Sequence, residues 1–429
     1  MLVGTTARRV AIIGGCRIPF ARGNGVYVEV GNQEMLTAAL RAVVDRYGLQ
    51  GQRLDDVAAG AVMKHSGQWN LTRESVLGSG LAAETPAFDL QRACGTSLEA
   101  AILLGNKIAL GQIDCGIAAG VDSVSDPPVA FPKSFQQLLL KSVRGKTTLQ
   151  RLRPWFGLRM EHMRPVLPGI AEPRTGLTMG ESAELMVSAW GISRRDQDQL
   201  ALESHQKAAA AYAAGFYGDL VHEYLGLTKD DNIRTDSSLE RLGALRPAFG
   251  GAGGGGSLTA GNSTPMTDGA AAVLLASEAW ARQRDLPVLA YLSYGKVAAV
   301  DFIDKKEGLL MAPAYAVPKM LSDADLRLQD FDFYELHEAF AGQVLCTLKA
   351  WTDPVFCREK LGLPSDLGAI DRAKINVKGG SLAIGHPFAA SGARILATLA
   401  KILNENKAKR GLIAVCTAGG MGVTAILER

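Results

Sequence analysis

Two stretches of the chain repeat one order of hydrophobic and polar positions. In the first, an extended segment at 88–90 and a turn precede a run of apolar residues at the spacing of one helix face, which are Leu98, Ala101, Ile102, Gly105, Ile108 and Ala109. A strand-like apolar segment follows at 116–121. In the second, a turn precedes a helical run with the apolar residues Ile395, Leu396, Leu399 and Ile402. An apolar strand then follows at 412–415. Because strands and helices alternate in both, we predict an α/β fold of two similar halves, with parallel sheets and helices on their faces.

The segment at 122–249 differs in texture, and we expect it to form an inserted loop domain. A helix is predicted at 193–216, where Ser193 can cap the N-terminus and Asp196 occupies the third position after it. Upstream, residues 133–164 are strongly basic and interleaved with leucines, Trp155 and Phe156, with a single acid, Glu161.

A glycine-rich stretch at 250–257 follows the loop domain. A strand-like segment comes next and no Lys-Ser/Thr pair is present, which argues against a phosphate-binding loop. We interpret the stretch as a flexible, low-complexity segment. The predicted domains are therefore an N-terminal half at 1–121 and 250–285, a loop domain at 122–249 and a C-terminal half at 286–429.

Composition narrows the class of protein. The 429 residues have room for two or three domains of about 100–200 residues each. The formal net charge of +3 is too small to indicate nucleic-acid binding, although it suits an anionic small substrate. No apolar run approaches the roughly 20 residues of a membrane span, and Met1 to Arg9 are too short for a signal peptide. The six cysteines lack metal-ligand or disulfide spacing, which favours a reducing compartment. We expect a cytoplasmic protein.

Two cysteines stand where a reactive thiol can form. Cys94 begins an apolar helix, where the helix dipole and free backbone N–H groups favour the thiolate. The alternative is that Cys94 is a small buried hydrophobic residue, as cysteines often are. Gly95 permits close approach of a ligand, which favours the nucleophile over this alternative only slightly. Cys416 ends an apolar strand before a glycine-rich turn, and strand ends of α/β sheets are where sites collect.

Two histidines lie in comparable places. His386 follows the glycines of the segment 379–385 and precedes Pro387, a position that suits a general base or a turn histidine bonded to backbone. His337 follows the strand at 333–336, where a structural histidine is the alternative.

Together these four sites resemble the thiolase family, in the family's order and over nearly the whole chain. The segments 179–184, 260–263 and 310–313 resemble further family motifs, the last being its acyl-pocket loop. The resemblance implies a five-layered αβαβα fold with an inserted loop domain. It also implies CoA-dependent thiolysis of a 3-ketoacyl-CoA in fatty-acid β-oxidation.

The resemblance also assigns roles. Cys94 would form the acyl-enzyme, His386 would take its proton, and Cys416 would exchange protons with the α-carbon. One oxyanion would be stabilised by His386 and a water held at His337, and the other by the backbone N–H groups of Cys94 and Ala418. Contacts with substrate and CoA are expected from Asn262, Ser263, Thr264 and Met311. No metal or tightly bound cofactor is implied, and CoA is the second substrate.

Three positions depart from the family pattern. Where the family commonly has Asn, this chain has His337, which resembles the fatty-acid-oxidation branch related to the trifunctional-enzyme β subunit. Ala389 and Ala418 stand where glycines are usual, and each adds only a methyl group.

Several alternatives stay open. The same steps could run towards condensation in a biosynthetic acetoacetyl-CoA thiolase. A ketoacyl synthase also uses one cysteine and two histidines, but it needs no acid like Cys416. A catalytically silent lipid or CoA binder would be expected to lack the nucleophile.

We expect a homodimer or higher homo-oligomer, with an α-type hydratase–dehydrogenase subunit as a possible partner. The basic stretch at 133–164 is expected to touch an anionic membrane or an acidic partner, the alternatives being CoA phosphates or a solvated face.

Overall fold

The computed structural model describes residues 7–169, 171–250 and 255–429. Residues 251–254 of the predicted glycine-rich segment, and residues 1–6 of the N-terminal segment, lie outside the described residues. The strands are β1 Val10–Arg17, β2 Ala21–Arg22, β3 Asp56–Ala59, β4 Ala87–Asp89, β5 Cys115–Asp122, β6 Thr267–Ser277, β7 Ala290–Ala299, β8 Phe333–Leu336, β9 Arg410–Thr417 and β10 Met421–Glu428.

The α-helices are α1 Asn32–Arg46, α2 Leu71–Leu77, α3 Thr96–Ala109, α4 Lys133–Arg144, α5 Thr148–Leu152, α6 Met179–Trp190, α7 Arg194–Ala213, α8 Leu239–Gly243, α9 Glu278–Gln283, α10 Ala312–Ala324, α11 Ala341–Trp351, α12 Pro354–Glu359, α13 Ser381–Ile384 and α14 Ser391–Glu405. Short 3-10 turns are η1 Ser66–Gln68, η2 Arg153–Gly157, η3 Met160–Met163, η4 Arg372–Lys374 and η5 Phe388–Ala390. In the part of the chain that the structure describes, no helix is both long and apolar enough to cross a membrane.

The strands are hydrogen-bonded in the order β4-β3-β5-β6-β1-β7-β10-β9-β8, with β2 beside β6. Strands from the N-terminal and C-terminal parts meet at β1 and β7, which pair only through Ala11–Tyr291 and Ile12–Ala290. The expectation of parallel sheets was wrong for much of this order. Among the strands that the structure describes, only β3 with β4, β3 with β5 and β8 with β9 are parallel. The strands β9 and β10 are antiparallel because a three-residue turn joins them directly.

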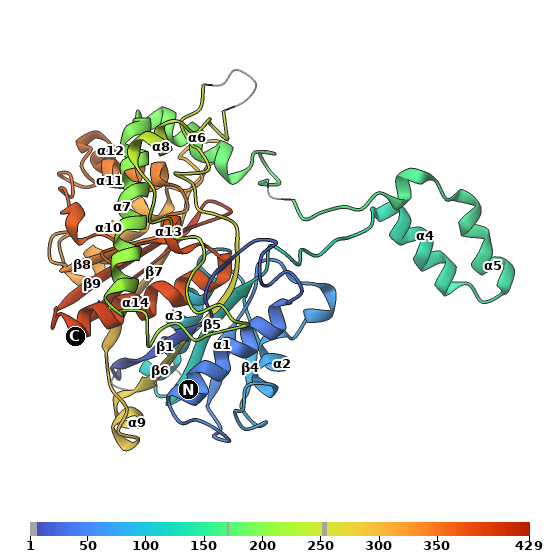
Figure 1. Cartoon of the computed structure of the whole chain (residues 1–429), viewed down its shortest axis with the longest axis horizontal. Helices are drawn as coiled ribbons and strands as arrows, with labels where there is room; N and C mark the ends of the chain where they lie inside the picture. The colour runs from blue at the N-terminus through green and yellow to red at the C-terminus, as the bar shows by residue number, and fades with distance from the viewer. Residues whose placement is uncertain (1–6, 170, 251–254) are drawn as a thin grey trace.

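Helices cover the strands in layers (Figure 1). The strands alternate at period two between different cores: on β1, Val10 and Ile12 pack with α3 and α14, whereas Ala11 and Ile13 pack with α1. On β9, Ile413 faces the α3 and α14 core, while the neighbouring positions face α10 and α11. Thus α3 and α14 form a buried middle layer that packs against strands from both the N-terminal and the C-terminal parts of this sheet. Helices on both faces of a mixed sheet confirm the predicted α/β class.

The predicted helix at 193–216 is α7, which begins at Arg194 and ends three residues early at Ala213. Ser193 caps it by accepting a hydrogen bond from the Asp196 N–H, as the sequence predicts. The division into two halves and a loop domain stays a prediction, because nothing beyond the chain's own layering tests its boundaries.

Within the predicted loop domain, α4 and α5 project from the body on two extended segments (Figure 1). Their packing is mainly internal: Phe135 of α4 meets the ring of Trp155 with 6.4 Å between centroids. Elsewhere the arm at 129–167 exposes apolar side chains, including Phe156 (87% exposed) and Met160 (85% exposed).

Candidate active site

The turn between β4 and α3 carries Cys94 on a strained backbone. Ala93 has φ +44, a left-handed conformation that costs a residue with a side chain on the order of 1 kcal/mol. The turn is closed by Thr96, whose hydroxyl accepts the Arg92 N–H at 2.9 Å and donates to the Ala93 carbonyl at 2.7 Å. Gly95 is the N-cap, so Cys94 stands just before the helix and not within its first turn as expected.

The Cys94 thiol is held in its neutral form. The residue as a whole is partly exposed, but the thiol is enclosed, and burial raises its pKa to about 12. Hydrogen bonds from the backbone N–H groups of Ala418 and of Cys94 itself oppose this rise in pKa. These are the two donors predicted for an oxyanion, and both reach the reactive sulfur.

His386 is fixed from two sides. Its backbone N–H donates to Thr267 Oγ1 at 2.8 Å, and its Nδ1 lies 2.6 Å from Ser391 Oγ. The Nε2 atom has no partner among the described residues. Burial lowers the pKa of His386 to about 3, with the positive charge of Arg394 adding to the effect, so the imidazole is neutral at neutral pH.

One serine brings the Cys94 turn and the His386 loop together. Ser97 Oγ donates to the Ala389 carbonyl at 2.5 Å and accepts the Ala393 N–H at 2.8 Å. The Ala389 N–H in turn donates to the buried carboxyl of Asp122 at 2.8 Å. Burial raises the pKa of Asp122 to about 7, against hydrogen bonds from backbone N–H groups including that of Ala389.

The predicted His337 lies against His386, with 4.2 Å between ring centroids. It follows β8, and its Nδ1 is 3.0 Å from Ser381 Oγ. Its Nε2 also has no partner among the described residues. Burial lowers the pKa of His337 well below its usual value, and His386 and Arg394 lower it further.

Behind Ser381 lie a buried arginine and a buried glutamate. Arg394, 2% exposed, donates to Ser381 Oγ at 2.8 Å, and Glu335 lies 4.0 Å from its guanidinium. Burial raises the pKa of Glu335 to about 8, although the charge of Arg394 opposes the rise. The chain Glu335–Arg394–Ser381–His337 thus links β8 and α14 to Nδ1 of the buried imidazole.

Glu338 braces the glycine loop. It accepts hydrogen bonds from Asn376 Nδ2 at 2.6 Å, from Ser204 Oγ at 2.7 Å and from the Leu382 N–H at 3.2 Å. A Cβ added at Gly380 would lie 2.2 Å from the Glu338 carboxyl carbon, so glycine is required where the loop passes this carboxyl.

Cys416 is 1% exposed near the end of β9 and packs in one cluster with Met311. Burial raises its pKa well above the usual value, and interaction with Cys94 raises it further. A hydrogen bond from the Ala339 N–H acts in the opposite direction. Two thiols and two imidazoles from four separate parts of the sequence therefore share one enclosed site.

The residues expected to bind CoA differ in what they face. Asn262 is buried and hydrogen-bonded within the protein. Its amide donates to Asp198 Oδ1 at 2.9 Å and accepts a hydrogen bond from the Thr259 N–H at 2.7 Å. Thr264 donates to the Ser381 carbonyl at 2.9 Å. Ser263 instead lines a cavity of about 260 Å³, and its hydroxyl has no partner among the described residues.

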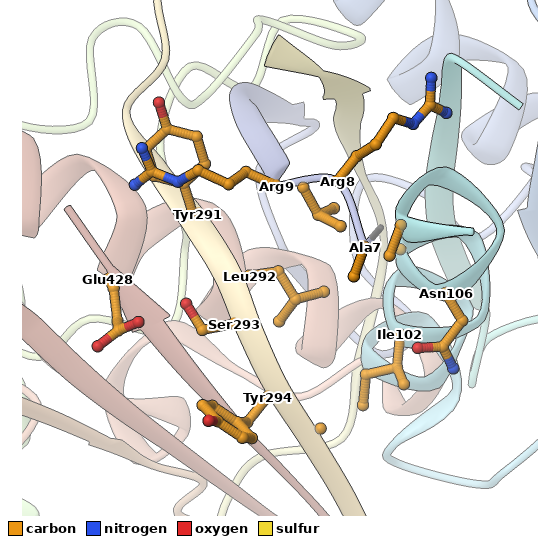
Figure 2. A pocket seen from close by; sticks show the side chains of 14 residues that line it. Ala7, Arg8, Arg9, Ile102, Asn106, Tyr291, Leu292, Ser293, Tyr294 and Glu428 are labelled. Atoms are coloured by element: carbon orange, nitrogen blue, oxygen red, sulfur yellow. The ribbon is translucent and has the colours of Figure 1, made fainter. Parts of the chain in front are cut away.

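A separate concavity of about 380 Å³ lies between α3, β7 and the start of β1 (Figure 2). Arg9 stacks over the Tyr291 ring with 3.3 Å to the centroid, while Arg8 points away to Asp114 at 2.7 Å. None of the four chemically reactive residues lines it, so the reaction centre lies elsewhere.

Sequence reasoning missed the residues that hold this site together, namely Ser97, Asp122, Ser204, Glu335, Glu338, Ser381, Ser391 and Arg394. A signal was present for some: Glu335 interrupts an apolar strand, and Arg394 interrupts an apolar helix. A charge in such a place is usually paired when buried.

Comparison with known proteins identifies the family and the fold. The family models "Thiolase, N-terminal domain" and "Thiolase, C-terminal domain" match residues 10–279 and 286–429. The chain therefore belongs to the thiolase family.

Individual members of the family are similar to this chain over nearly its whole length. It is 40% identical, over 433 aligned residues, to 3-ketoacyl-CoA thiolases of Yersinia pestis and Yersinia pseudotuberculosis, covering all of this chain and 98% of each relative. An acetyl-CoA acetyltransferase of Bacillus anthracis has the same fold, with a TM-score of 0.81, 28% identity and 99% and 100% of the two chains covered. That of Syntrophomonas wolfei also has a TM-score of 0.81, at 26% identity, covering 98% of this chain and 99% of its own.

The two alanines that stand where the resemblance leads us to expect glycines cause no backbone strain. Ala389 and Ala418 both have φ outside the left-handed region. What each supplies to the site is a backbone group, which an added methyl group leaves in place.

Proposed function

We propose that the chain is a degradative 3-ketoacyl-CoA thiolase, which cleaves its substrate with CoA into acetyl-CoA and a shortened acyl-CoA. The observation that carries the proposal is one enclosed centre that holds a cysteine, two neutral histidines and a second cysteine. The names of the Yersinia relatives support the same reaction.

In the first half-reaction, the Cys94 sulfur attacks the 3-keto carbon while His386 takes the thiol proton. The attack and the proton transfer occur together, because at rest the thiol pKa is raised and the imidazole pKa is lowered. The bond between C2 and C3 then breaks, and the electron pair goes to C2 of the leaving acetyl-CoA. Cys416 donates the proton that this carbon needs, and an acyl group stays on Cys94.

In the second half-reaction, CoA gives its thiol proton to the Cys416 thiolate. The CoA sulfur attacks the acyl-enzyme carbonyl, and Cys94 leaves and recovers its proton from His386. The oxyanion formed on the acyl group faces the backbone N–H groups of Cys94 and Ala418, which already reach the sulfur in the resting site.

The two histidines act as opposite tautomers. Arg394 can only donate, so Ser381 Oγ accepts from it and has its own proton free for His337 Nδ1. We therefore assign the His337 proton to Nε2, where it donates to an oxyanion directly. His386 as the base keeps an Nε2 lone pair and donates from Nδ1 to Ser391.

CoA would occupy the cavity next to Ser263. Arg234 and Arg241 line it and suit the phosphates, while Asn232 Nδ2 and Ser263 Oγ are unpartnered there and suit the amides of the pantetheine arm.

The acyl chain would leave the centre past Met311. Met311 shares an apolar cluster with Cys416 and Met186, and Met186 also lines an apolar cavity of about 450 Å³ with Trp190 and Phe302. Flexible methionines at this junction suit chains of different length.

The test is the rate of thiolysis across a series of 3-ketoacyl-CoA substrates of increasing chain length, beside the rate of acetoacetyl-CoA synthesis from acetyl-CoA. The proposal expects thiolysis of longer chains to exceed condensation in kcat/KM. A preference for acetyl-CoA condensation would favour the biosynthetic alternative. The Bacillus and Syntrophomonas neighbours, which are named acetyl-CoA acetyltransferases, support that alternative. No turnover in either direction would leave a silent CoA or lipid binder.

We propose further that the arm at 129–167 rests on an anionic membrane surface. Between Lys133 and Arg164 it has eight Lys and Arg residues against Glu161 alone, beside exposed Phe156 and Met160. Apolar side chains can enter the headgroup region while the cations meet anionic lipid, at about 1 kcal/mol for each charge.

Replacing Arg151, Arg153 and Arg159 with Ser should weaken binding to vesicles containing anionic phospholipid by on the order of a hundredfold, since about 3 kcal/mol is lost. The KM for CoA should not change. Replacing the exposed residues Arg282, Arg327 and Arg358, which lie outside the arm, is the matched control and should leave vesicle binding intact. Loss of CoA affinity in the arm variant, with no vesicle binding by the parent chain, would assign the arm to substrate approach.

We also propose an oligomeric state, a partner subunit and a cellular location for the chain. We expect a homodimer or higher homo-oligomer in the cytoplasm, with CoA and acyl-CoA as substrates and an α-type hydratase–dehydrogenase subunit as partner. Analytical ultracentrifugation of the chain alone and with such a subunit tests both parts.

A further inference from the structure

The reaction centre contains a donor set for a transition metal. One ligand atom of Cys94, one of His337 and one of His386 all lie within 4.8 Å of one another. The two histidines are 1% and 3% exposed, and each has a buried Nε2 without a partner among the described residues. Thus one sulfur and two imidazole nitrogens lie close enough together for one ion to join them.

The outer atoms of both rings are already held in the way that metal-binding histidines require. Ser381 Oγ meets Nδ1 of His337, and Ser391 Oγ meets Nδ1 of His386. In metal sites the second ring nitrogen is commonly bonded to such a partner, which orients the ring and leaves the other nitrogen for the ion.

The geometry requires only a small adjustment. In tetrahedral zinc sites with bond lengths of about 2.0–2.3 Å, ligand atoms are about 3.3–3.7 Å apart, so the three atoms, which lie within 4.8 Å of one another, must approach by at most about 1.1–1.5 Å. Cys94 belongs to a partly exposed turn, where side-chain rotation can supply this movement. Sulfur with two imidazole nitrogens favours Zn²⁺ over Mg²⁺ or Ca²⁺, which prefer oxygen.

We propose that this centre binds Zn²⁺ as a reversible inhibitor, with the Cys94 thiolate, His337 and His386 as ligands and solvent in the fourth position. Binding releases the thiol proton of Cys94 to solvent. The ring proton of His337 moves from Nε2 to Nδ1, and the Nδ1–H then donates a hydrogen bond to Ser381 Oγ. The ion occupies the nucleophile and the base together, so it excludes the acyl group. This site goes beyond the thiolase reaction, in which the ion has no role.

The test uses the full chain and Co²⁺ as a spectroscopic probe for the zinc site. The chain should bind one Co²⁺ with a sulfur-to-cobalt charge-transfer band, and Zn²⁺ should displace it. Cys94→Ser should lose the band, and His337→Asn should bind about tenfold more weakly or worse, since even outer-shell changes cost that much. Cys416→Ala is the matched control, because it removes a neighbouring buried thiol that is not among the three ligands, and it should keep the band.

A second measurement needs no variant. Zn²⁺ should slow alkylation of Cys94 by iodoacetamide on the order of tenfold, and Mg²⁺ should not. Loss of the band in Cys416→Ala with an unchanged band in His337→Asn would overturn the proposal, as would alkylation unaffected by Zn²⁺. Because neither readout measures turnover, failure here is distinguishable from failure of the thiolase assignment.

Discussion

Ser381→Ala tests whether the buried network sets the tautomer of His337. The serine is fully buried, and its hydroxyl joins Arg394 at 2.8 Å to His337 Nδ1 at 3.0 Å. The hydrogen bond from the Ser381 hydroxyl to Nδ1 is the interaction that favours the Nε2–H tautomer of His337, and the substitution removes it. A net hydrogen bond of about 1–1.5 kcal/mol corresponds to a fall in kcat of about tenfold. Removing the donor altogether in His337→Ala sets the upper limit, about 10²–10³.

The assay is steady-state thiolysis with kcat and KM determined separately. Ser381→Ala should lower kcat and leave KM for the 3-ketoacyl-CoA nearly unchanged, since the donor acts on charge that develops in the transition state. Unfolding stability should fall by about 1–3 kcal/mol, because Arg394 loses its hydroxyl partner. Ser79→Ala is the matched control: Ser79 is equally buried and donates to the Val76 carbonyl at 2.7 Å, remote from the centre in sequence. A kcat of Ser381→Ala within twofold of the parent, or a change confined to KM, would refute the positioning role.

Three further outcomes follow from the same geometry. Cys416→Ala should form acyl-enzyme but lose solvent-deuterium exchange into the methyl group of acetyl-CoA, measured by NMR; undiminished exchange would remove the acid–base role. Burial lowers the pKa of His205 to about 4. Between about pH 6.5 and 4, His205 is therefore protonated in the unfolded chain but neutral in the native chain. Stability is therefore lost as pH falls through this window, by about 1.4 kcal/mol for each pH unit, and His205→Gln should flatten that slope in chemical denaturation. Gly380→Ala should lose most activity because its Cβ would meet the Glu338 carboxyl at 2.2 Å, whereas Gly67→Ala, with nothing within 4 Å, should not.

Much of the fold was predictable because its hydrophobic pattern is local. The helix predicted around Leu98 and the one opened by Ser391 are α3 and α14, and their apolar faces meet in the middle layer. The mixed strand directions were missed, because pairing depends on contacts between residues far apart in sequence, such as Val10 with Ser277. Cys94 also lies before its helix, a displacement set by the left-handed Ala93 that no periodicity reveals.

The four candidate residues could be singled out because each stands near an element boundary, and Cys94, His386 and Cys416 also have glycines or a proline close by. The groups that position them could not, since a serine such as Ser97 or Ser381 looks like any other polar residue in sequence. Their roles arise only in the folded chain, where Ser97 at the start of α3 bonds to the loop before α14 and Ser381 at the start of α13 bonds to His337. The same holds for Asn262, which is predicted to contact CoA and whose hydrogen bonds within the protein its sequence position does not reveal.

The central claim is that Cys94 carries the acyl group. The most direct test is to mix the chain with a 3-ketoacyl-CoA in the absence of CoA, quench with acid and map the modified peptide by mass spectrometry. We predict the mass of the shortened acyl group on Cys94, its removal when CoA is added, and no adduct in Cys94→Ser. An acyl group on Cys416, or turnover by Cys94→Ser at a tenth or more of the parent rate, would contradict the account.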